Sequence, residues 1–330
     1  MLRVLVTGSN GFVGRATVSA CLHAGFAVRA GVRRRTGANA ANFSEQALRL
    51  PADVVEYGAL ASNTDWSSAL DNVDCVIHLA ARAHVMSDRA SDPLAEFRQT
   101  NVEGTLSLAR AAAARGINKF IYVSSIKVNG ERTSLGHPFT AEDEPLPADP
   151  YGISKFEAEQ GLRELEQHSE LDVVIVRPVL VYGPGVKANF RTIMRVLNTG
   201  VPLPLGGLSN RRSLVGLGNL ANFLVTCAQL EAAAHKTFLV SDGEDLSTSE
   251  LLRRLALLLD RPVRLFNFPT SALERVAMLL GKGNVAQRLL GTLQVDSSAT
   301  RAALGWVPPF SVDEELQRTV ESYLKEGGSR

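Results

Sequence analysis

A tyrosine, a lysine and two serines in the middle of the chain have the types and spacing needed for proton transfer. Tyr151 and Lys155 are four residues apart, and Asp149 and Pro150 before them predict a helix start. The two side chains would then lie on one face of that helix. An ammonium group beside a tyrosine lowers its pKa from about 10, so the pair could exchange a proton with a substrate hydroxyl or carbonyl.

The serines give this pair its significance, because Tyr-x-x-x-Lys alone also describes an ordinary surface pair. Ser124 and Ser125 end a buried strand predicted over residues 119–125. A serine hydroxyl at that point could polarise a substrate carbonyl.

A glycine-rich turn near the start of the chain predicts a phosphate-binding site. A short aliphatic strand over residues 2–6 is followed by Gly8, Gly11 and Gly14, and then by a helix that ends at Gly25. In such a turn the first two glycines let the backbone approach a pyrophosphate, and the third lets helix and strand pack closely. Strand, glycine turn and helix in this order are typical of dinucleotide binding.

Three arginines at the end of the second predicted strand, residues 27–32, indicate which dinucleotide is bound. An acidic residue at this place binds the ribose of NAD, whereas arginine accommodates the 2′-phosphate of NADP. Val32 stands where the acidic residue would be, and Arg33, Arg34 and Arg35 follow it. We therefore favour NADP over NAD; the alternative is a solvated basic loop.

The remaining pattern predicts an α/β fold with a doubly wound parallel sheet. Further strands are expected over 53–57, 74–81, 172–181 and 237–241, with helices over 93–115 and 214–230 and a short helix within 36–50. Helices over 246–260, 270–280 and 312–324 predict a smaller, mostly helical C-terminal part. We assign residues 1–183 and 214–241 to the dinucleotide-binding domain and residues 184–213 and 242–330 to a substrate lobe.

The composition is that of an ordinary globular protein. The net charge of +1 offers no overall attraction to nucleic acid or to an anionic membrane, and no apolar run is long enough to cross a bilayer. Cys21, Cys75 and Cys227 are scattered in apolar surroundings, which predicts core packing in a reducing compartment and no metal site. No signal peptide is recognisable, so we expect a cytoplasmic protein.

Several polar residues lie near the predicted carboxyl ends of strands, where open α/β sheets bind ligands. Arg82 and His84 follow the strand over 74–81 and are candidates for substrate contact. His78, inside that strand, is expected to be a hydrogen-bonded structural residue rather than a base. Asn101 beside Gly104 is expected to bend the helix over 93–115 or to bind water.

Taken together, these segments resemble the extended short-chain dehydrogenase/reductase family, specifically its nucleotide-sugar epimerase/dehydratase branch. The resemblance covers nearly the whole chain. Its motifs are TGSNGFVG at 7–14, HLAA at 78–81, NVEGT at 101–105, YVSS at 122–125, YGISK at 151–155, RPVLVYGPG at 177–185 and RRSLVGLGNLA at 211–221.

The resemblance implies roles for individual residues. Tyr151 would be the acid/base, Lys155 would hold it and the nicotinamide ribose, and Ser125 would bond the reacting sugar oxygen. The cofactor-binding candidates, besides Tyr151 and Lys155, are Gly8, Asn10, Gly11, Phe12, Val13, Gly14, Arg33, Arg34, Leu79, Ala80, Ala81, Asn101, Ser124 and Pro178. The substrate-binding candidates are Arg82, His84, Ser125, Lys127, Asn189, Phe190, Arg212 and Arg288, with the two late arginines on a UDP diphosphate and residues 189 and 190 in a covering loop.

Two departures from the family pattern narrow the reaction. Dehydratases of this branch carry Asp-Glu where this chain has Ile126 and Lys127, so we do not expect a 4,6-dehydratase. Ala59 stands where an aspartate usually meets the adenine, which leaves that contact open.

Two reactions at C4 of the sugar remain. We favour reduction of a UDP-4-keto-6-deoxy-N-acetylhexosamine for surface polysaccharide, because Arg33 and Arg34 favour NADPH and SSIKVNGE at 124–131 resembles such 4-reductases. The alternative is a UDP-glucose or UDP-N-acetylglucosamine 4-epimerase that retains NAD. A non-catalytic, cofactor-bound regulator is the alternative of another class. The resemblance also implies a homodimer formed through a four-helix contact.

Overall fold

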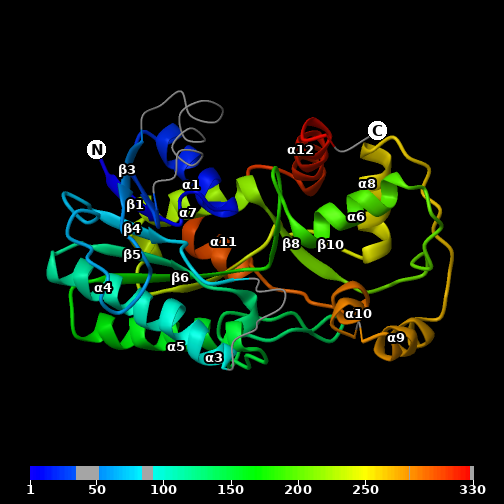
Figure 1. Ribbon diagram of the computed structural model, residues 1–330, viewed down its shortest axis with the longest axis horizontal. Coiled ribbons are helices and arrows are strands. Elements are labelled where there is room, and N and C mark those ends of the chain that lie inside the picture. The colour runs from blue at the N-terminus through cyan, green and yellow to red at the C-terminus, as the bar shows by residue number, and fades with distance from the viewer. Residues whose placement is uncertain (35–51, 84–91, 282, 328–330) are drawn as a thin grey trace.

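The computed structural model describes residues 1–34, 52–83, 92–281 and 283–327 (Figure 1). Seven strands form a parallel sheet in the order β3-β2-β1-β4-β5-β6-β9. They are β1 (Arg3–Thr7), β2 (Ala27–Val32), β3 (Asp53–Glu56), β4 (Cys75–His78), β5 (Lys119–Val123), β6 (Asp172–Pro178) and β9 (Thr237–Val240). The strand order reverses direction between β1 and β4, so the predicted doubly wound α/β fold is confirmed.

Helices cover both faces of this sheet (Figure 1). One face packs against α1 (Phe12–His23), α7 (Leu217–Gln229) and α11 (Ser298–Leu304). The other packs against α4 (Gly104–Ala114) and α5 (Pro150–Gln167). Alternate residues of each strand serve the two faces, as in β5, where Ile121 faces the first and Phe120 the second. Strands buried on both sides explain the continuous apolar runs in the sequence.

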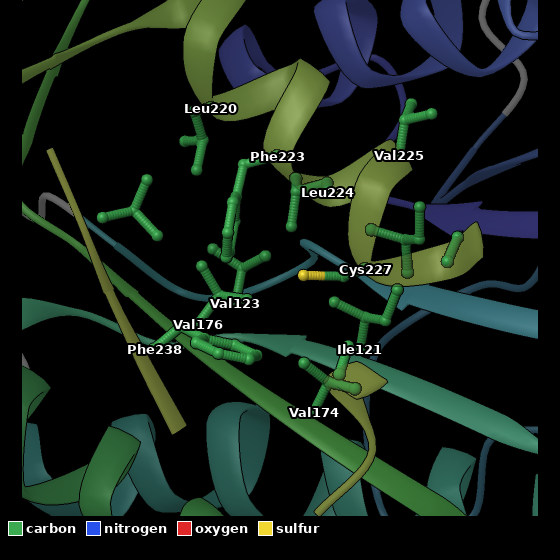
Figure 2. Close-up of a cluster of buried hydrophobic side chains, with 14 of the residues drawn as sticks. Ile121, Val123, Val174, Val176, Leu220, Phe223, Leu224, Val225, Cys227 and Phe238 are labelled. Carbon is green, nitrogen blue, oxygen red and sulfur yellow. The ribbon is translucent and has the colours of Figure 1, made fainter. Parts of the chain in front are cut away.

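The three cysteines lie in the core between the sheet and the face formed by α1, α7 and α11; Figure 2 shows part of this core, with Cys227 labelled. Cys21, Cys75 and Cys227 are buried and free, and all three belong to this apolar cluster. Burial raises the pKa of Cys21 and of Cys75 to about 12, so these thiols stay protonated and unreactive. Phe223 packs against Trp306 with ring centroids 4.9 Å apart. The prediction that the cysteines serve as core packing is confirmed.

The helix predicted over 93–115 is interrupted. The structure has α3 (Pro93–Phe97), then one stretch of π-helix (Arg98–Glu103), then α4. The side chain of Asn101 projects from the π-helical stretch to bond the backbone of Arg82 in the loop after β4. The extra residue in the helical turn therefore serves to aim a polar side chain, which is a common use of π-bulges.

The strand predicted over 172–181 is in fact two strands. β6 ends at Pro178, which lacks an N–H group, and β7 (Leu180–Tyr182) joins a second sheet of order β10-β8-β7. The predicted start of the next helix at residue 214 is also wrong. Residues 212–216 form β8 (Arg212–Gly216), and the helix α7 begins only after this strand. The helix predicted within 36–50 lies outside the described residues.

The C-terminal half is mostly helical, as predicted. This half has a core of its own, the C-terminal core, which joins α6 (Ala188–Asn198), α8 (Thr248–Leu258) and α12 (Val312–Lys325) to β8 and to β10 (Asp245–Leu246). α9 (Thr270–Leu279) and α10 (Gly283–Leu290) form a small satellite cluster with each other. α10 and α11 were not predicted, because each is only about two helical turns long.

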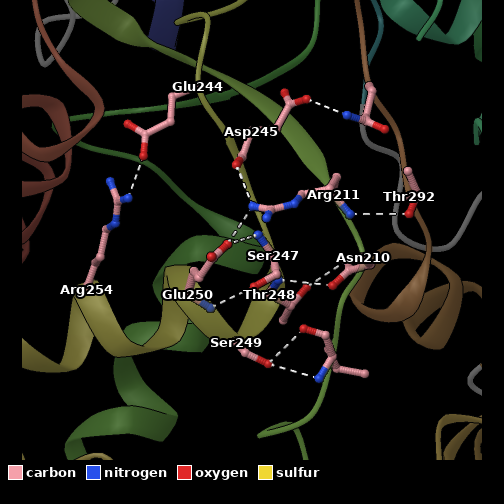
Figure 3. Close-up of polar contacts among 12 residues, drawn as sticks. Asn210, Arg211, Glu244, Asp245, Ser247, Thr248, Ser249, Glu250, Arg254 and Thr292 are labelled. Carbon is pink, nitrogen blue, oxygen red and sulfur yellow. Dashed lines mark hydrogen bonds and ion pairs between the residues drawn. The ribbon is translucent and has the colours of Figure 1, made fainter. Parts of the chain in front are cut away.

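A polar network fixes the segment that leads into β8 (Figure 3). Arg211 donates to Glu250 at 3.0 Å, and Glu250 also closes the capping box of α8 with Ser247. The carboxamide of Asn210 accepts from the backbone N–H of Thr248 at 3.1 Å and donates to its hydroxyl at 3.2 Å. These bonds hold residues 210 and 211 on α8, and so position the next residue, Arg212.

Glu315 of α12 is fully buried at the joint between α12 and α7, and it predicts a pH dependence of stability. Its Oε1 accepts from the N–H of Gly218 at 3.1 Å, and Asp242 lies nearby. Burial raises the pKa of Glu315 to about 7 from an ordinary value of 4.5, despite the opposing charge of Arg318. The native state therefore binds a proton that the unfolded state has lost at pH 5–6.

We expect Glu315→Gln to abolish this contribution. A raised carboxyl pKa stabilises the native state at low pH, and the stabilisation is lost as pH rises from about 4.5 through about 7. Above pH 7 the variant should be more stable than the unmodified protein, by about 1–3 kcal/mol. Urea unfolding of both proteins between pH 5 and 8 measures this; a constant difference across that range would contradict it.

Candidate active site

The carboxyl edge of the sheet, at the reversal between β1 and β4, brings the glycine turn against the end of β4. Gly8 has φ +66°, and a Cβ there would lie 2.9 Å from the backbone nitrogen of Ala80. A Cβ on Gly14 would lie 2.1 Å from the carbonyl oxygen of Gly8. Side chains are therefore sterically excluded at both positions, as the sequence predicted.

The glycine turn leaves a helix N-terminus open. α1 begins after Gly11, which offers no side-chain cap, and its first turn holds no acidic residue. Asn10, Phe12 and Val13 belong to the turn and to the first turn of this helix. Free N–H groups with a positive helix end form the arrangement that binds a pyrophosphate, so these residues fit a dinucleotide.

The other candidate cofactor residues lie along the same edge. Ser9 fixes the turn by donating to the carbonyl of Gly31 at 2.8 Å. Arg33 and Arg34 are exposed just beyond β2, where the sequence placed them; Arg35 and His84 lie outside the described residues. Leu79, Ala80 and Ala81 follow β4, and Pro178 ends β6.

His78 is structural, as expected. It is fully buried, with Nδ1 2.7 Å from the hydroxyl of Thr7 and Nε2 2.9 Å from the hydroxyl of Thr105. Burial, aided by the charge of Lys155, lowers its pKa to about 3, so the ring is neutral at physiological pH. His78 thus ties β1 and β4 to α4.

Asn101 also acts through its neighbours. Its Oδ1 accepts from the N–H of Arg82 at 2.8 Å, and its Nδ2 donates to the carbonyl of Arg82 and to the hydroxyl of Ser154. Both donor hydrogens are used, so the residue clamps the backbone after β4 to α5. These bonds fix the loop after β4, and the predicted contact of Asn101 with the cofactor stays a prediction.

Tyr151 and Lys155 share one face of α5, which is capped by Asp149 with Pro150 in its first turn, as predicted. Lys155 Nζ donates to the carbonyl of Val123 at 2.9 Å and lies 5.9 Å from the ring centroid of Tyr151. Burial lowers the pKa of Lys155 to about 7, opposed by the charge of Glu159.

The pKa of Tyr151 moves in the direction opposite to our expectation. Burial raises it above the usual range, and the charge of Asp149 raises it further. The ammonium of Lys155 does not outweigh these two effects in the protein alone. Tyr151 therefore holds its proton firmly until further positive charge arrives beside it.

The two serines lie at the end of β5. The hydroxyl of Ser124 is buried and has no hydrogen-bond partner among the described residues. Ser125 is half-buried, and its Oγ accepts from the N–H of Lys127 at 3.2 Å. A buried hydroxyl without a partner is rare in proteins, and here it indicates a ligand that would supply one.

Lys127 forms a charge cluster rather than a free cation. Its Nζ donates to Glu131 at 3.0 Å and to Asp149, the cap of the helix that carries Tyr151. Glu131 in turn accepts from Gln287 of α10 at 3.4 Å. These bonds offset the charge of Asp149 that raises the pKa of Tyr151, and the substrate contact of Lys127 stays a prediction.

Lys127→Met should therefore shift the pH dependence of activity upward. Without the ammonium, Asp149 would raise the pKa of Tyr151 further, and the shift should be up to about one pH unit because the cluster is partly exposed. A profile of kcat/KM against pH measures it, and Lys127→Arg should restore the original position. An unshifted profile would show that the cluster serves only to hold the loop.

Arg212 and Arg288 come together although 75 residues separate them in sequence. Arg212 donates to the carbonyl of Gly291 at 3.1 Å, and Arg288 lies on α10, which precedes Gly291. Burial lowers the pKa of Arg212, and the charge of Arg288 lowers it further. Neither forms an ion pair with a carboxylate of the described residues. Two adjacent unpaired arginines suit a phosphate or carboxylate ligand.

The loop predicted to cover the substrate at residues 189 and 190 is the start of a helix. Residues 189 and 190 lie in the first turn of α6. The ring of Phe190 is 2% exposed and stacks on Tyr182 with centroids 5.3 Å apart. The ring therefore packs in the core and is not presented to a ligand, and the predicted substrate contact of Phe190 stays a prediction. The side chain of Asn189 lies outside the described structure.

A buried ion pair below Lys155 was missed. Glu159 accepts from Arg177 through two nitrogens, the shortest contact being 2.5 Å, and Arg177 also donates to Asn129 at 3.0 Å. Both charged side chains are almost fully buried. Glu159 lies one helical turn after Lys155, and that spacing was the signal that could have revealed it.

The strand order, the glycine turn and the Ser-Tyr-Lys arrangement define the class of the protein as an extended short-chain dehydrogenase/reductase. The sequence profile of the NAD dependent epimerase/dehydratase family matches residues 4–240, and the chain belongs to that family. The predicted family is confirmed, and the protein is an NAD-dependent enzyme of this type.

Relatives agree with this assignment. The chain is 44% identical over 324 residues to a UDP-glucose 4-epimerase of Vibrio cholerae, covering 98% of this chain and 95% of that one. It is 24% identical to an N-acetyl-alpha-D-glucosaminyl-diphospho-ditrans,octacis-undecaprenol 4-epimerase of Escherichia coli O157:H7, covering 96% and 94% of the two.

Solved structures share the fold. The UDP-glucuronic acid 4-epimerase of Bacillus cereus in complex with NAD superposes with a TM-score of 0.78 at 20% identity, over 99% of this chain and all of that one. The UDP-glucose 4-epimerase of Thermotoga maritima gives 0.75 at 22% identity, over 98% of this chain and 99% of that one. The first of these contains NAD, and the preference for NADP finds no support in the comparisons.

Proposed function

We propose that the protein is a UDP-hexose 4-epimerase, which moves a hydride from C4 of the sugar to the cofactor and returns it to the other face. The observation that carries this proposal is the set formed by Ser125, Tyr151 and Lys155 at the carboxyl end of β5, with no acidic residue at 126 or 127. The 44% identity to a UDP-glucose 4-epimerase supports the choice of sugar position and nucleotide.

The chain supplies the acid/base chemistry. Tyr151 would take the proton of the C4 hydroxyl and give it back, and the half-buried hydroxyl of Ser125 would bond the same oxygen. The ammonium of Lys155 would lower the free energy of forming the Tyr151 phenolate. Its hydrogen bond to the carbonyl of Val123 fixes its orientation. The nicotinamide would accept the hydride, and its positive charge would favour ionisation of a tyrosine whose pKa is raised in the protein alone.

Two further parts would bind the rest of the ligands. The open N-terminus of α1 and the closely packed glycines would hold the pyrophosphate of NAD. Arg212 and Arg288 would bind the diphosphate of the UDP-sugar. The same proposal assigns substrate binding to the C-terminal lobe, residues 184–213 and 242–330.

A second candidate is reduction of a UDP-4-keto-sugar with NADPH. Arg33 and Arg34 favour it, since both are exposed beyond β2 and neither forms an ion pair within the described residues. Such a site accommodates a 2′-phosphate. The same Ser-Tyr-Lys chemistry would run in one direction, and the cofactor would leave after each turnover.

A cofactor assay separates the two candidates. The purified protein is denatured, any released nucleotide is identified, and intact protein is then given UDP-glucose alone or a UDP-4-keto-6-deoxy-N-acetylhexosamine with NADPH. Retained NAD with formation of UDP-galactose and no net absorbance change supports the epimerase. Stoichiometric oxidation of NADPH by a protein free of nucleotide supports the reductase, and no reaction with either substrate would contradict both.

We also propose that the protein is a cytoplasmic homodimer that serves polysaccharide synthesis. The expected contact would use α4 and α5, which pack side by side on one face of the sheet. Light scattering of the purified protein measures the mass, and a monomer at all concentrations would contradict the dimer.

A further inference from the structure

The C-terminal lobe exposes an apolar surface around α9. Six large apolar side chains lie on it: Phe266, Phe268, Val276, Met278, Leu279 and Leu280. They are six of the fifteen exposed large hydrophobic residues in the described chain, yet they fall within fifteen consecutive positions. Leu279 is 86% exposed and Leu280 66%. Scattered apolar residues are normal on a protein surface, but such clustering marks a site of interaction. We call these six residues the α9 surface.

The α9 surface is supported by ordered structure beneath it. Phe266 pairs with the backbone of Leu203, donating its N–H at 3.0 Å, and its own carbonyl accepts from Gly206 at 2.9 Å. On α9, Leu273 and Ala277 face the satellite cluster with α10. Those contacts use the inner side of the helix, and none of the residues of α9 is fully buried. The exposed apolar side chains of α9 are therefore held by a fixed scaffold.

The charge around the α9 surface is unlike that of the whole chain. The described residues of 261–288 carry four arginines (Arg261, Arg264, Arg275 and Arg288) and one acidic residue, Glu274. The complete chain has a net charge of +1. None of the four arginines forms an ion pair with a carboxylate of the described residues. Arg275 and Leu279 are one helical turn apart, so a cation borders the most exposed leucine.

An apolar face bordered by unpaired cations fits one partner, the interface of an anionic membrane. Leucine, phenylalanine and methionine side chains enter the boundary between headgroups and acyl chains, while arginines contact the anionic headgroups. A second copy of this chain fits less well, because a symmetric contact would place the like-charged arginine clusters against each other. No helix of the described residues is long and apolar enough to cross a bilayer. Association at the surface, without insertion across it, is therefore the mode that remains.

We propose that the α9 surface docks the protein on anionic lipid bilayers. α9 packs on α10, beside which it lies in Figure 1, and α10 carries Arg288. The inference does not depend on the proposed reaction, because none of the six residues of the α9 surface belongs to the predicted catalytic set.

Co-sedimentation with vesicles tests this. The full-length protein is mixed with phosphatidylcholine vesicles that contain phosphatidylglycerol, and with vesicles of phosphatidylcholine only. We expect binding to the anionic vesicles that weakens as salt is raised, because the arginine contribution is electrostatic. The double variant Leu279→Glu/Leu280→Glu should lower the partition coefficient at least about tenfold, since both apolar contacts are lost and two acidic charges are added.

Val307 provides the matched control, since it is 72% exposed and lies outside the α9 surface. Val307→Glu should bind the anionic vesicles like the unmodified protein. The proposal is overturned if no vesicle sediments the protein, if both vesicle types bind it equally, or if the double variant binds unchanged. It is also overturned if the α9 surface instead joins two copies of the chain, seen as self-association that the double variant abolishes. Unchanged circular dichroism establishes that each variant is folded.

Discussion

Tyr151→Phe should lower kcat by about 10²–10⁴-fold and leave the fold and cofactor content unchanged. The substitution removes only the hydroxyl oxygen. The ring keeps its edge contact with Phe97, at a centroid distance of 6.1 Å, and its place near Lys155. No hydrogen bond from this hydroxyl to another described residue is lost. The effect should therefore fall on proton transfer rather than on stability, and it is measured by steady-state kinetics beside thermal unfolding.

A tyrosine outside the site serves as the control. Tyr323 of α12 is buried in the C-terminal core, where its hydroxyl accepts a hydrogen bond from Asn198 at 3.3 Å. Tyr323→Phe should retain full activity per folded molecule. Full activity of Tyr151→Phe would remove the acid/base role and favour a non-catalytic protein that only binds the cofactor.

Arg177→Met should lower the free energy of unfolding by about 3–5 kcal/mol. Arg177 is the charge partner of Glu159, and both side chains are almost fully buried beneath the site. Removing the guanidinium leaves a buried carboxylate without its cation and removes the bond to Asn129. Urea unfolding measures the change. Replacing both partners, as Glu159→Leu with Arg177→Met, should restore much of the loss, because neither member of the pair is left as a buried charge without its partner.

An exposed pair of the same chemistry separates burial from pairing. Arg98 and Glu157 form a contact of 2.5 Å on the surface, where water screens both charges. Arg98→Met should change stability little. Equal losses for Arg98→Met and Arg177→Met would show that pairing, and not burial, sets the cost.

The sequence predicted the parts of this molecule that depend on local rules. The glycine turn was recognisable because only glycine fits where a Cβ on residue 14 would meet the Gly8 carbonyl. The start of α5 was recognisable from Asp149 and Pro150, a cap and a first-turn proline. Buried parallel strands left continuous apolar runs, and their alternation with helices indicated a doubly wound parallel sheet, whereas the order of the strands came from the structure.

Other parts depend on partners that are distant in sequence. The run over 172–181 reads as one strand, and only the second sheet shows that β7 leaves the first after Pro178. Phe190 looked available for a ligand because nothing near it in sequence reveals that Tyr182 covers its ring. The ion pair of Lys127 with Asp149 was not predicted for the same reason, since Asp149 lies 22 residues away. The pKa of Tyr151 could not be inferred from spacing, because burial sets its direction.

One isotope measurement tests the central claim, that a hydride moves at C4 of a UDP-hexose. The protein is incubated with UDP-glucose that carries deuterium on C4, and the product is analysed by nuclear magnetic resonance and mass spectrometry. The account predicts UDP-galactose with the deuterium still on C4, because the hydride leaves and returns without contact with water. Loss of the deuterium to solvent, or product altered at another carbon, would contradict it.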